Sequence, residues 1–207
     1  VYWMRVWEVP KGSRSSRGRP IINFWPLEDG ERVTTVLPVK SFDENRYVFM
    51  ATNLGTVKKT SLSKFARPMK RGIIAAALDD GDTLIGATIT DGNQDIMLFS
   101  TSGKAVRYSE SDVRPMGRGS RGVRGMLLDK NQRVVSMLSV PNNNDQDLSN
   151  LVDKTVFIAT QNGFGKRTSL REFTRYSRGT KGMICIKTST RNGLVVGACS
   201  VSYTHLR

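Results

Sequence analysis

Residues 55–65 read GTVKKTSLSKF, and residues 163–173 read GFGKRTSLREF. Six of the eleven positions are identical, and Lys59 is matched by Arg167. A third copy, GKAVRYSESDV at 103–113, places a glycine and Arg107 at the corresponding positions. The same basic segment thus returns at intervals of about 50 to 60 residues, which indicates a repeat architecture.

Each copy is flanked in the same way. An apolar run precedes the glycine, as in YVFMATNLG at 47–55, and predicts a strand, a tight turn and a second strand. A basic residue and a glycine follow at 71–72, 121–122 and 181–182, and another apolar run closes the copy. The polar stretch PNNNDQDLSN at 141–150 lengthens the last interval and is typical of a surface loop.

Four short strands per repeat predict an all-β chain of β-propeller-type blades. The first 40 residues fit the same frame without its opening strand, and VYWMRVWEV occupies the slot of the second strand. A tandem β array of another kind, such as a solenoid, is the alternative. The predicted organisation is a partial blade at 1–40, blades at 47–90, 95–140 and 155–201, and a tail at 202–207 outside the repeat.

The positive charge follows the repeat. The formal net charge is +14 and the sequence pI is about 10.2. Segments 55–72, 103–124 and 163–182 together hold 18 Lys or Arg and only three acidic residues. A merely solvated surface would mix the two signs. The segregated charge predicts a polyanionic partner: nucleic acid first, an anionic membrane or an acidic protein after it.

Little in the composition suggests catalysis. The single His, His205, cannot build a triad or a metal cluster, and Cys185 and Cys199 match no metal motif. No run approaches the ~20 apolar residues of a membrane span, and no signal peptide is visible. Trp3, Trp7 and Trp25 are interpreted as packing residues. We expect a piece of a longer protein from a reducing cytoplasm, because the chain lacks an initiator Met and cysteines are few.

Several motifs together resemble one family. They are VYWMRVWEVP (1–10), VFMATNLGTVKKTSLSKF (48–65), IMLFSTSGKAVRY (96–108), ATQNGFGKRTSLREF (159–173) and RNGLVVGA (191–198). The chain resembles the C-terminal domain of bacterial DNA gyrase A from about residue 1 to about residue 201. SYTHLR at 202–207 resembles no gyrase segment.

The resemblance implies a six-bladed propeller in which neighbouring blades exchange strands, and duplex DNA wrapped around its basic rim. The whole enzyme, a type IIA topoisomerase, adds negative supercoils at the expense of ATP. It is a heterotetramer in which two gyrase A chains assemble with gyrase B. ATP and Mg²⁺ would be bound elsewhere, so we expect no cofactor, metal or catalytic residue here. The expected location is the bacterial cytoplasm, on the nucleoid.

The family's Q-R-R-G-G-K-G box is absent, and the basic-Gly pairs resemble degenerate copies of it. The candidate DNA-binding residues are Arg14, Arg17, Arg19, Lys58, Lys59, Lys70, Arg71, Lys104, Arg107, Arg118, Arg121, Arg124, Lys166, Arg167, Arg178 and Lys181. Two alternatives stay open: the C-terminal domain of the topoisomerase IV protein that corresponds to gyrase A, and a propeller that serves as a protein-binding scaffold.

Overall fold

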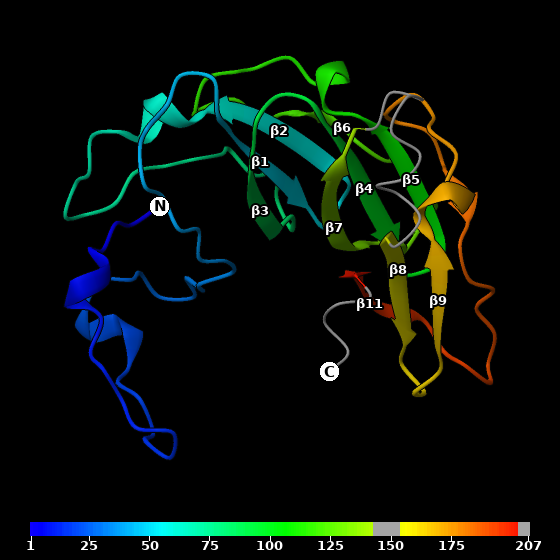
Figure 1. Cartoon of the computed structure of the whole chain (residues 1–207), viewed down its shortest axis with the longest axis horizontal. Helices are drawn as coiled ribbons and strands as arrows, with labels where there is room; N and C mark the ends of the chain where they lie inside the picture. Colours follow the sequence, from blue (N-terminus) through cyan, green and yellow to red (C-terminus); the bar gives the residue numbers. More distant parts are fainter. Residues whose placement is uncertain (143–153, 203–207) are drawn as a thin grey trace.

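Three antiparallel sheets stand side by side in an arch (Figure 1). The structure, a computed structural model, describes residues 1–142 and 154–202. Most of the surface loop predicted at 141–150, and all but the first residue of the tail at 202–207, lie outside the described residues. Among the described residues, the only helices are 3-10 turns of three or four residues, and none could cross a membrane.

Sheets A and B each contain four strands, and sheet C contains three. Sheet A has the order β3 (Leu84–Thr90), β1 (Tyr47–Thr52), β2 (Thr56–Ser61), β6 (Val123–Arg124). Sheet B has the order β10 (Met183–Ile184), β5 (Lys104–Ser109), β4 (Gln94–Ser100), β7 (Val134–Pro141). Sheet C has the order β11 (Val195–Ser202), β8 (Lys154–Thr160), β9 (Gly165–Ser169). The prediction of an all-β fold with four-stranded blades is confirmed.

The outermost strand of a sheet comes from the following repeat. Strand β6 belongs to the repeat of sheet B but pairs with β2 of sheet A, where Val57 is opposite Val123. Strand β10 belongs to the repeat of sheet C and pairs with β5 of sheet B, where Ala105 is opposite Met183. Neighbouring blades therefore exchange strands, as the resemblance implied.

The hairpin glycines are fixed by this exchange. Gly103 has a φ of +78°, and a Cβ there would lie 2.1 Å from the carbonyl oxygen of Ile186 in the following repeat. Its own carbonyl oxygen accepts hydrogen bonds from the N–H groups of Cys185 and Ile186. Gly55 repeats the arrangement with Gly125 and Met126. A side chain at either turn would push the two blades apart, so glycine recurs there.

Alternate residues of the central strand fill two different cores. Ile96 and Leu98 of β4 pack toward sheet A, in a cluster that includes Phe49. Met97 and Phe99 pack toward sheet C, in a cluster that includes Ile158. Because side chains alternate between the faces of a strand, sheet B is buried on both faces. On the outer face of sheet C, by contrast, Phe157 is 40% exposed.

Residues 1–46 form no strand, which differs from the predicted second-strand slot. They form two 3-10 turns, η1 (Val6–Glu8) and η2 (Ile21–Asn23), joined by irregular backbone. A strand needs a ladder of backbone hydrogen bonds, and here one reciprocal pair joins Val1 to Ile73. The Val1–Ile73 pair nevertheless occupies the place in its repeat that the Val57–Val123 pair occupies in sheet A.

The predicted packing role holds for two of the three tryptophans. Trp3 packs against the cluster that contains Met50 and Phe65, and the Trp25 indole N–H donates to the Trp3 carbonyl oxygen at 3.0 Å. Trp7, on η1, is instead 75% exposed, with the Arg5 guanidinium 5.8 Å from its ring centre.

Candidate nucleic-acid interface

Three loops carry the repeat's positive charge toward the neighbouring blade. We call them the crossover loops and define them as residues 62–72, 110–122 and 170–182. Each begins at a 3-10 turn, η3 (Leu62–Phe65), η4 (Glu110–Asp112) or η6 (Leu170–Glu172), and ends at the basic-Gly pair. In Figure 1 the second and third loops pass along the outer side of the arch. The exchange of strands therefore places equivalent loops of successive repeats on one rim.

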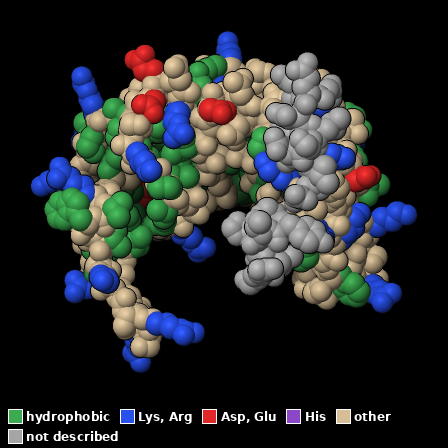
Figure 2. Space-filling model, in the orientation of Figure 1, with side chains coloured by type: hydrophobic (Ala, Val, Ile, Leu, Met, Phe, Trp, Pro, Cys, Tyr) green, Lys and Arg blue, Asp and Glu red, His purple; other side chains and the backbone are tan. Residues whose placement is uncertain are grey.

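Most of the candidate residues are exposed, and they lie on the crossover loops, on the N-terminal segment or on strands β6 and β9. Figure 2 shows Lys and Arg side chains projecting around the outside of the arch. The exposed candidates are Arg14, Arg17, Arg19, Lys70, Arg71, Arg121, Arg124, Lys166, Arg167 and Lys181, and the half-buried ones are Lys104, Arg118 and Arg178. Exposed cations that can follow a phosphate backbone are suited to binding without base recognition.

Lys58 does not belong to this exposed set, which corrects its predicted role. Its side chain is buried, and the ammonium group donates to the carbonyl oxygens of Ala75 at 2.7 Å, Ser120 at 2.9 Å and Arg118. Burial lowers the pKa of this ammonium below its usual value. Lys58 thus holds crossover-loop backbone and presents no charge to a phosphate.

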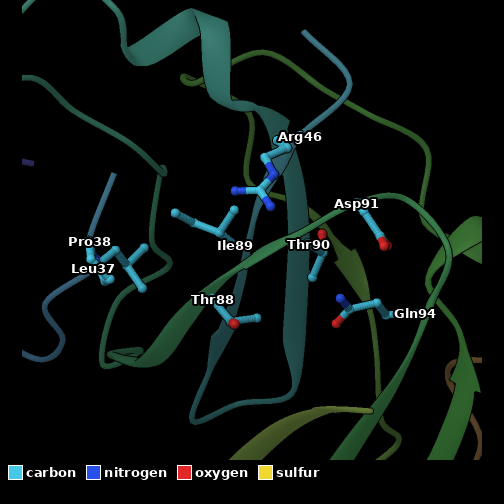
Figure 3. A pocket seen from close by; sticks show the side chains of 8 residues that line it. All are labelled: Leu37, Pro38, Arg46, Thr88, Ile89, Thr90, Asp91 and Gln94. Atoms are coloured by element: carbon cyan, nitrogen blue, oxygen red, sulfur yellow. The ribbon is translucent and has the colours of Figure 1, made fainter. Parts of the chain in front are cut away.

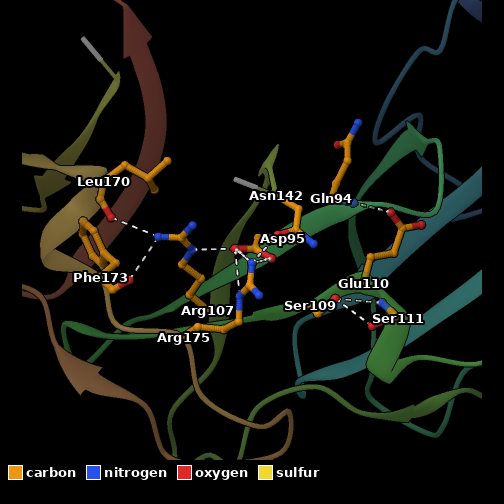
Figure 4. A network of polar contacts seen from close by, with 10 residues as sticks. All are labelled: Gln94, Asp95, Arg107, Ser109, Glu110, Ser111, Asn142, Leu170, Phe173 and Arg175. Carbon is orange, nitrogen blue, oxygen red and sulfur yellow. Dashed lines mark hydrogen bonds and ion pairs between the residues drawn. The ribbon is translucent and has the colours of Figure 1, made fainter. Parts of the chain in front are cut away.

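Lys59 is also buried, at the junction between sheets A and B. Its ammonium nitrogen lies 3.0 Å from the Glu110 carbonyl oxygen and 3.9 Å from the Glu110 carboxylate, and 5.0 Å from the centre of the Tyr47 ring. Burial lowers the pKa of Lys59, and the Glu110 charge opposes that shift. The Glu110 carboxylate also accepts a hydrogen bond from the Thr90 hydroxyl. Figure 4 shows a further one that it accepts from the Gln94 N–H. The predicted DNA contact of Lys59 is therefore also corrected.

Arg107 occupies the same place at the junction between sheets B and C (Figure 4). Its guanidinium donates to the Asp95 carboxylate at 2.8 Å and to the carbonyl oxygens of Leu170 and Phe173, both at 3.2 Å. Asp95 is fully buried and also receives Arg175 at 2.8 Å. A buried carboxylate with two guanidinium partners holds both of them in the junction, so Arg107 is likewise corrected to a structural residue.

Arg121 and Lys181, the cations that end two of the loops, are partly neutralised by aspartates of the preceding repeat, and one of these aspartates also pairs with Lys104 of its own repeat. Arg121 lies 2.9 Å from the Asp79 carboxylate. Lys181 and Lys104 lie 2.5 and 2.9 Å from the Asp129 carboxylate. The hydrogen bonds from these two lysines hold the pKa of Asp129 below its usual value. Such surface pairs contribute little to stability, because solvent screens them.

Two further candidates donate to backbone oxygens. Lys166 donates to the Cys185 carbonyl at 3.0 Å, and Arg178 donates to the carbonyls of Asp112 and Arg124, both at 3.0 Å. The candidate list omitted five exposed cations of the same loops: Lys64, Arg67, Arg114, Arg171 and Arg175. Their signal was present, because they lie within the basic segments that define the repeat.

The structure also offers a pocket beside sheet A (Figure 3). Arg46 and Asp91 are the charged residues of its lining, which contains no Ser, Cys, His or Lys. Across the described residues, no three His, Cys, Asp or Glu side chains form a group that could hold a metal ion. The extended basic rim therefore remains the candidate site.

Comparison with known proteins identifies the family. The family model described as "DNA gyrase C-terminal domain, beta-propeller" matches residues 1–40, 46–91, 94–141 and 154–201. Curated DNA gyrase A proteins from Salmonella typhimurium and Escherichia coli are 49% and 50% identical over 201 residues, 97% of this chain. The chain spans about a fifth of their length, 22%.

Two solved structures share the fold. The C-terminal domain of DNA topoisomerase IV superposes with a TM-score of 0.79 at 25% identity, covering 89% of this chain and 55% of that one. A DNA gyrase A C-terminal domain superposes with a TM-score of 0.75 at 27% identity, covering 90% and 59%. With a family model that matches nearly the whole repeat region, the chain belongs to the β-propeller family of DNA gyrase C-terminal domains.

Proposed function

We propose that this chain binds duplex DNA along the crossover loops and bends it around the outside of the arch. The observation that carries the proposal is the placement of the charge. The three loops contain eleven Lys or Arg and three acidic residues, and Glu110, one of those three, is buried. DNA carries about one negative charge per ~1.7 Å of its axis, so a rim of recurring cations matches a periodic polyanion.

The energetics require several blades to act together. Each neutralised phosphate releases condensed counterions and adds affinity, largely without regard to sequence. Bending a site of 20–30 base pairs costs on the order of 1–6 kcal/mol, and the phosphate contacts must offset this cost. Loops repeated along one rim can offset this cost, because each adds contacts to the same bent path.

Within the whole protein, the proposed role is that of the wrapping domain of DNA gyrase A. Wrapped DNA would be presented for strand passage by an ATP-dependent enzyme that introduces negative supercoils. Gyrase B and a second copy of gyrase A would complete the heterotetramer, and ATP and Mg²⁺ would be bound outside this chain. The proposed location is the bacterial cytoplasm, on the nucleoid.

Sequence identity favours this role over the two alternatives. Curated gyrase A relatives are 49–50% identical to the chain over 97% of its length, whereas the two solved domains, at 27% for gyrase A and 25% for topoisomerase IV, do not separate the two. A protein-binding scaffold would leave the segregated positive charge unexplained. We therefore keep DNA wrapping as the proposed function.

A salt titration of binding tests the proposal. Filter binding is measured with two unrelated duplexes of equal length between about 50 and 200 mM salt. Six to ten phosphate contacts predict a loss of roughly a thousandfold or more in affinity over this range. We expect the two duplexes to give the same affinity at each salt concentration. Flat salt dependence, or a tenfold preference for one duplex, would overturn the proposal.

A further inference from the structure

We propose that Lys59 and Arg107 are positioning residues, each of which fixes the crossover loop of the following blade. The proposal explains why two of the three copies of the recurring segment have a buried cation at this position. Its consequence for DNA rests on the proposed function, but the clamp itself can be tested without DNA.

A backbone hydrogen bond joins each of these two residues to the following loop. The Lys59 carbonyl oxygen accepts the N–H of Met116 at 2.8 Å, and the Arg107 carbonyl oxygen accepts the N–H of Tyr176 at 2.7 Å. Met116 and Tyr176 each lie three residues after the buried apolar side chain that follows the 3-10 turn, Val113 or Phe173. The same backbone contact thus joins blade to blade at both junctions.

The side chains of Lys59 and Arg107 also bind the following loop. The Lys59 ammonium donates to the carbonyl oxygen of Glu110, the first residue of η4. The Arg107 guanidinium donates to the carbonyl oxygen of Leu170, the first residue of η6. One residue per blade therefore holds the following loop twice, by its carbonyl oxygen and by its cation.

The C-terminal end of each of these two loops is attached to the same preceding blade. Strands β6 and β10 begin directly after the crossover loops and pair with the same strands that carry Lys59 and Arg107. Gly122 and Gly182, the last residues of the loops, lie so close to this strand that a Cβ would approach the carbonyl oxygens of Val57 and Ala105 to 2.5 and 2.2 Å. Each loop is thus anchored at both ends to a single strand of the preceding blade.

The consequence follows from this double anchoring. Arg114, Arg118 and Arg178, which are exposed or half-buried, lie between the two anchors, so their positions depend on the clamp. Loss of the clamp should leave the loop attached by β6 or β10 and by its remaining contacts, such as those of Lys58 and Arg178, while the start of the loop loosens. Phosphate contacts would still form, but they would no longer impose one path on the DNA.

Arg107→Met is the decisive variant, because Asp95 keeps Arg175 as a partner and is not left unpaired. Hydrogen exchange is measured in the 207-residue chain without DNA. We expect the Tyr176 amide and its neighbours in 170–182 to exchange about ten- to a hundredfold faster, the range for losing hydrogen bonds to a charged group. Amides of β1 and β2 should keep their rates.

Arg107→Lys is the conservative control. A lysine there can still donate to the Leu170 carbonyl, as Lys59 does to Glu110 at the other junction. We expect it to restore most of the protection. Unchanged exchange in Arg107→Met, or an equal increase in β1, β2 and the loop, would overturn the clamp, the second because it marks general destabilisation.

The DNA readout uses energy transfer between dyes on the two ends of a duplex. If the loops set the path, Arg107→Met should reduce the transfer efficiency in the complex while the low-salt affinity stays within about twofold, since exposed phosphate-binding cations are retained. Unchanged end-to-end transfer would overturn the clamp's role in DNA bending. If the wild-type chain fails to bind DNA, the proposed function falls, and the exchange result still decides the clamp.

Discussion

The two blade junctions have the same backbone geometry but opposite charge arrangements. At the junction of sheets A and B, the later blade supplies the carboxylate, Glu110, and the earlier blade supplies one cation, Lys59. At the junction of sheets B and C, the earlier blade supplies the carboxylate, Asp95, which binds Arg107 of its own sheet and Arg175 of the later repeat. The repeat thus preserves where a cation is needed, while each junction finds its own counter-charge.

The largest effect should come from removing the carboxylate with two partners. Asp95→Ala leaves Arg107 buried beside carbonyl oxygens only, and breaking a buried ion pair by removing one partner costs about 3–5 kcal/mol. Glu110→Leu is the matched change at the other junction. Leu62 and Leu170 fill the corresponding position in the other repeats, and the Glu110 carboxylate lies 3.9 Å from Lys59, so we expect a smaller loss of about 1–3 kcal/mol. Urea unfolding measures both losses, and equal values would remove the distinction between the junctions.

The next effect compares a glycine inside a junction with one on the outer edge of sheet C. Gly103→Ala adds left-handed strain of about 1–2 kcal/mol and also pushes against the Ile186 carbonyl, so the free energy of unfolding should fall by about 3 kcal/mol or more. Gly163 has a similar φ of +80°, but a Cβ there would meet nothing within 4 Å. Gly163→Ala should therefore cost only the strain, about 1–2 kcal/mol. Similar losses in thermal or urea unfolding would contradict the role assigned to the close approach.

The repeat and its strands could be predicted because glycines and apolar runs report local requirements. Gly55 and Gly103 need positive φ and close backbone contact, and both needs leave a mark in the sequence. The fate of the cations could not be predicted in the same way. Whether Lys59 or Arg107 is buried depends on carbonyl oxygens of the following repeat, which no charge count reveals.

One signal for the buried cations was nevertheless available. Glu110 stands where the other repeats have Leu62 and Leu170, and an acidic residue in an apolar position suggests a buried partner. Asp95 is similar, because Tyr47 and Thr155 occupy its place before the other hairpins. Strands in residues 1–40 were expected from pattern alone, but only one backbone pair joins that segment to a blade as a strand would be joined.

A third prediction separates the rim from bulk charge. Arg71→Gln, Arg121→Gln and Lys181→Gln together remove exposed cations at the ends of the three crossover loops, whereas the control set Lys130, Arg133 and Arg191 lies near the closing strands. Each phosphate contact contributes about 0.9 to the slope of log affinity against log salt concentration. The slope of the rim variant should therefore be shallower by up to about 2.7. In a reconstituted enzyme, the rim variant should lower supercoiling and spare relaxation. Equal losses in both triple variants would leave no argument from charge position.

The smallest effect has the opposite sign and returns to the two junctions. Asp79 pairs with Arg121 at one of them, and Asp129 pairs with both Lys104 and Lys181 at the other. Asp129→Asn should release two cations and raise DNA affinity at low salt, steepening the salt slope by up to about 1.8; Asp79→Asn releases one and should add up to about 0.9. Filter binding of both variants against salt measures the difference. Stability should change little, because these surface pairs are screened by solvent. The pKa of Asp129 lies below its unfolded value, so the stabilisation from its ion pairs is present at neutral pH and is lost as the pH falls through the folded pKa.

The gain in DNA affinity from Asp129→Asn should therefore be largest at neutral pH and shrink in acid, where the wild-type carboxyl is protonated as well. If either variant weakens binding, these aspartates orient the rim cations instead of competing with phosphate for them.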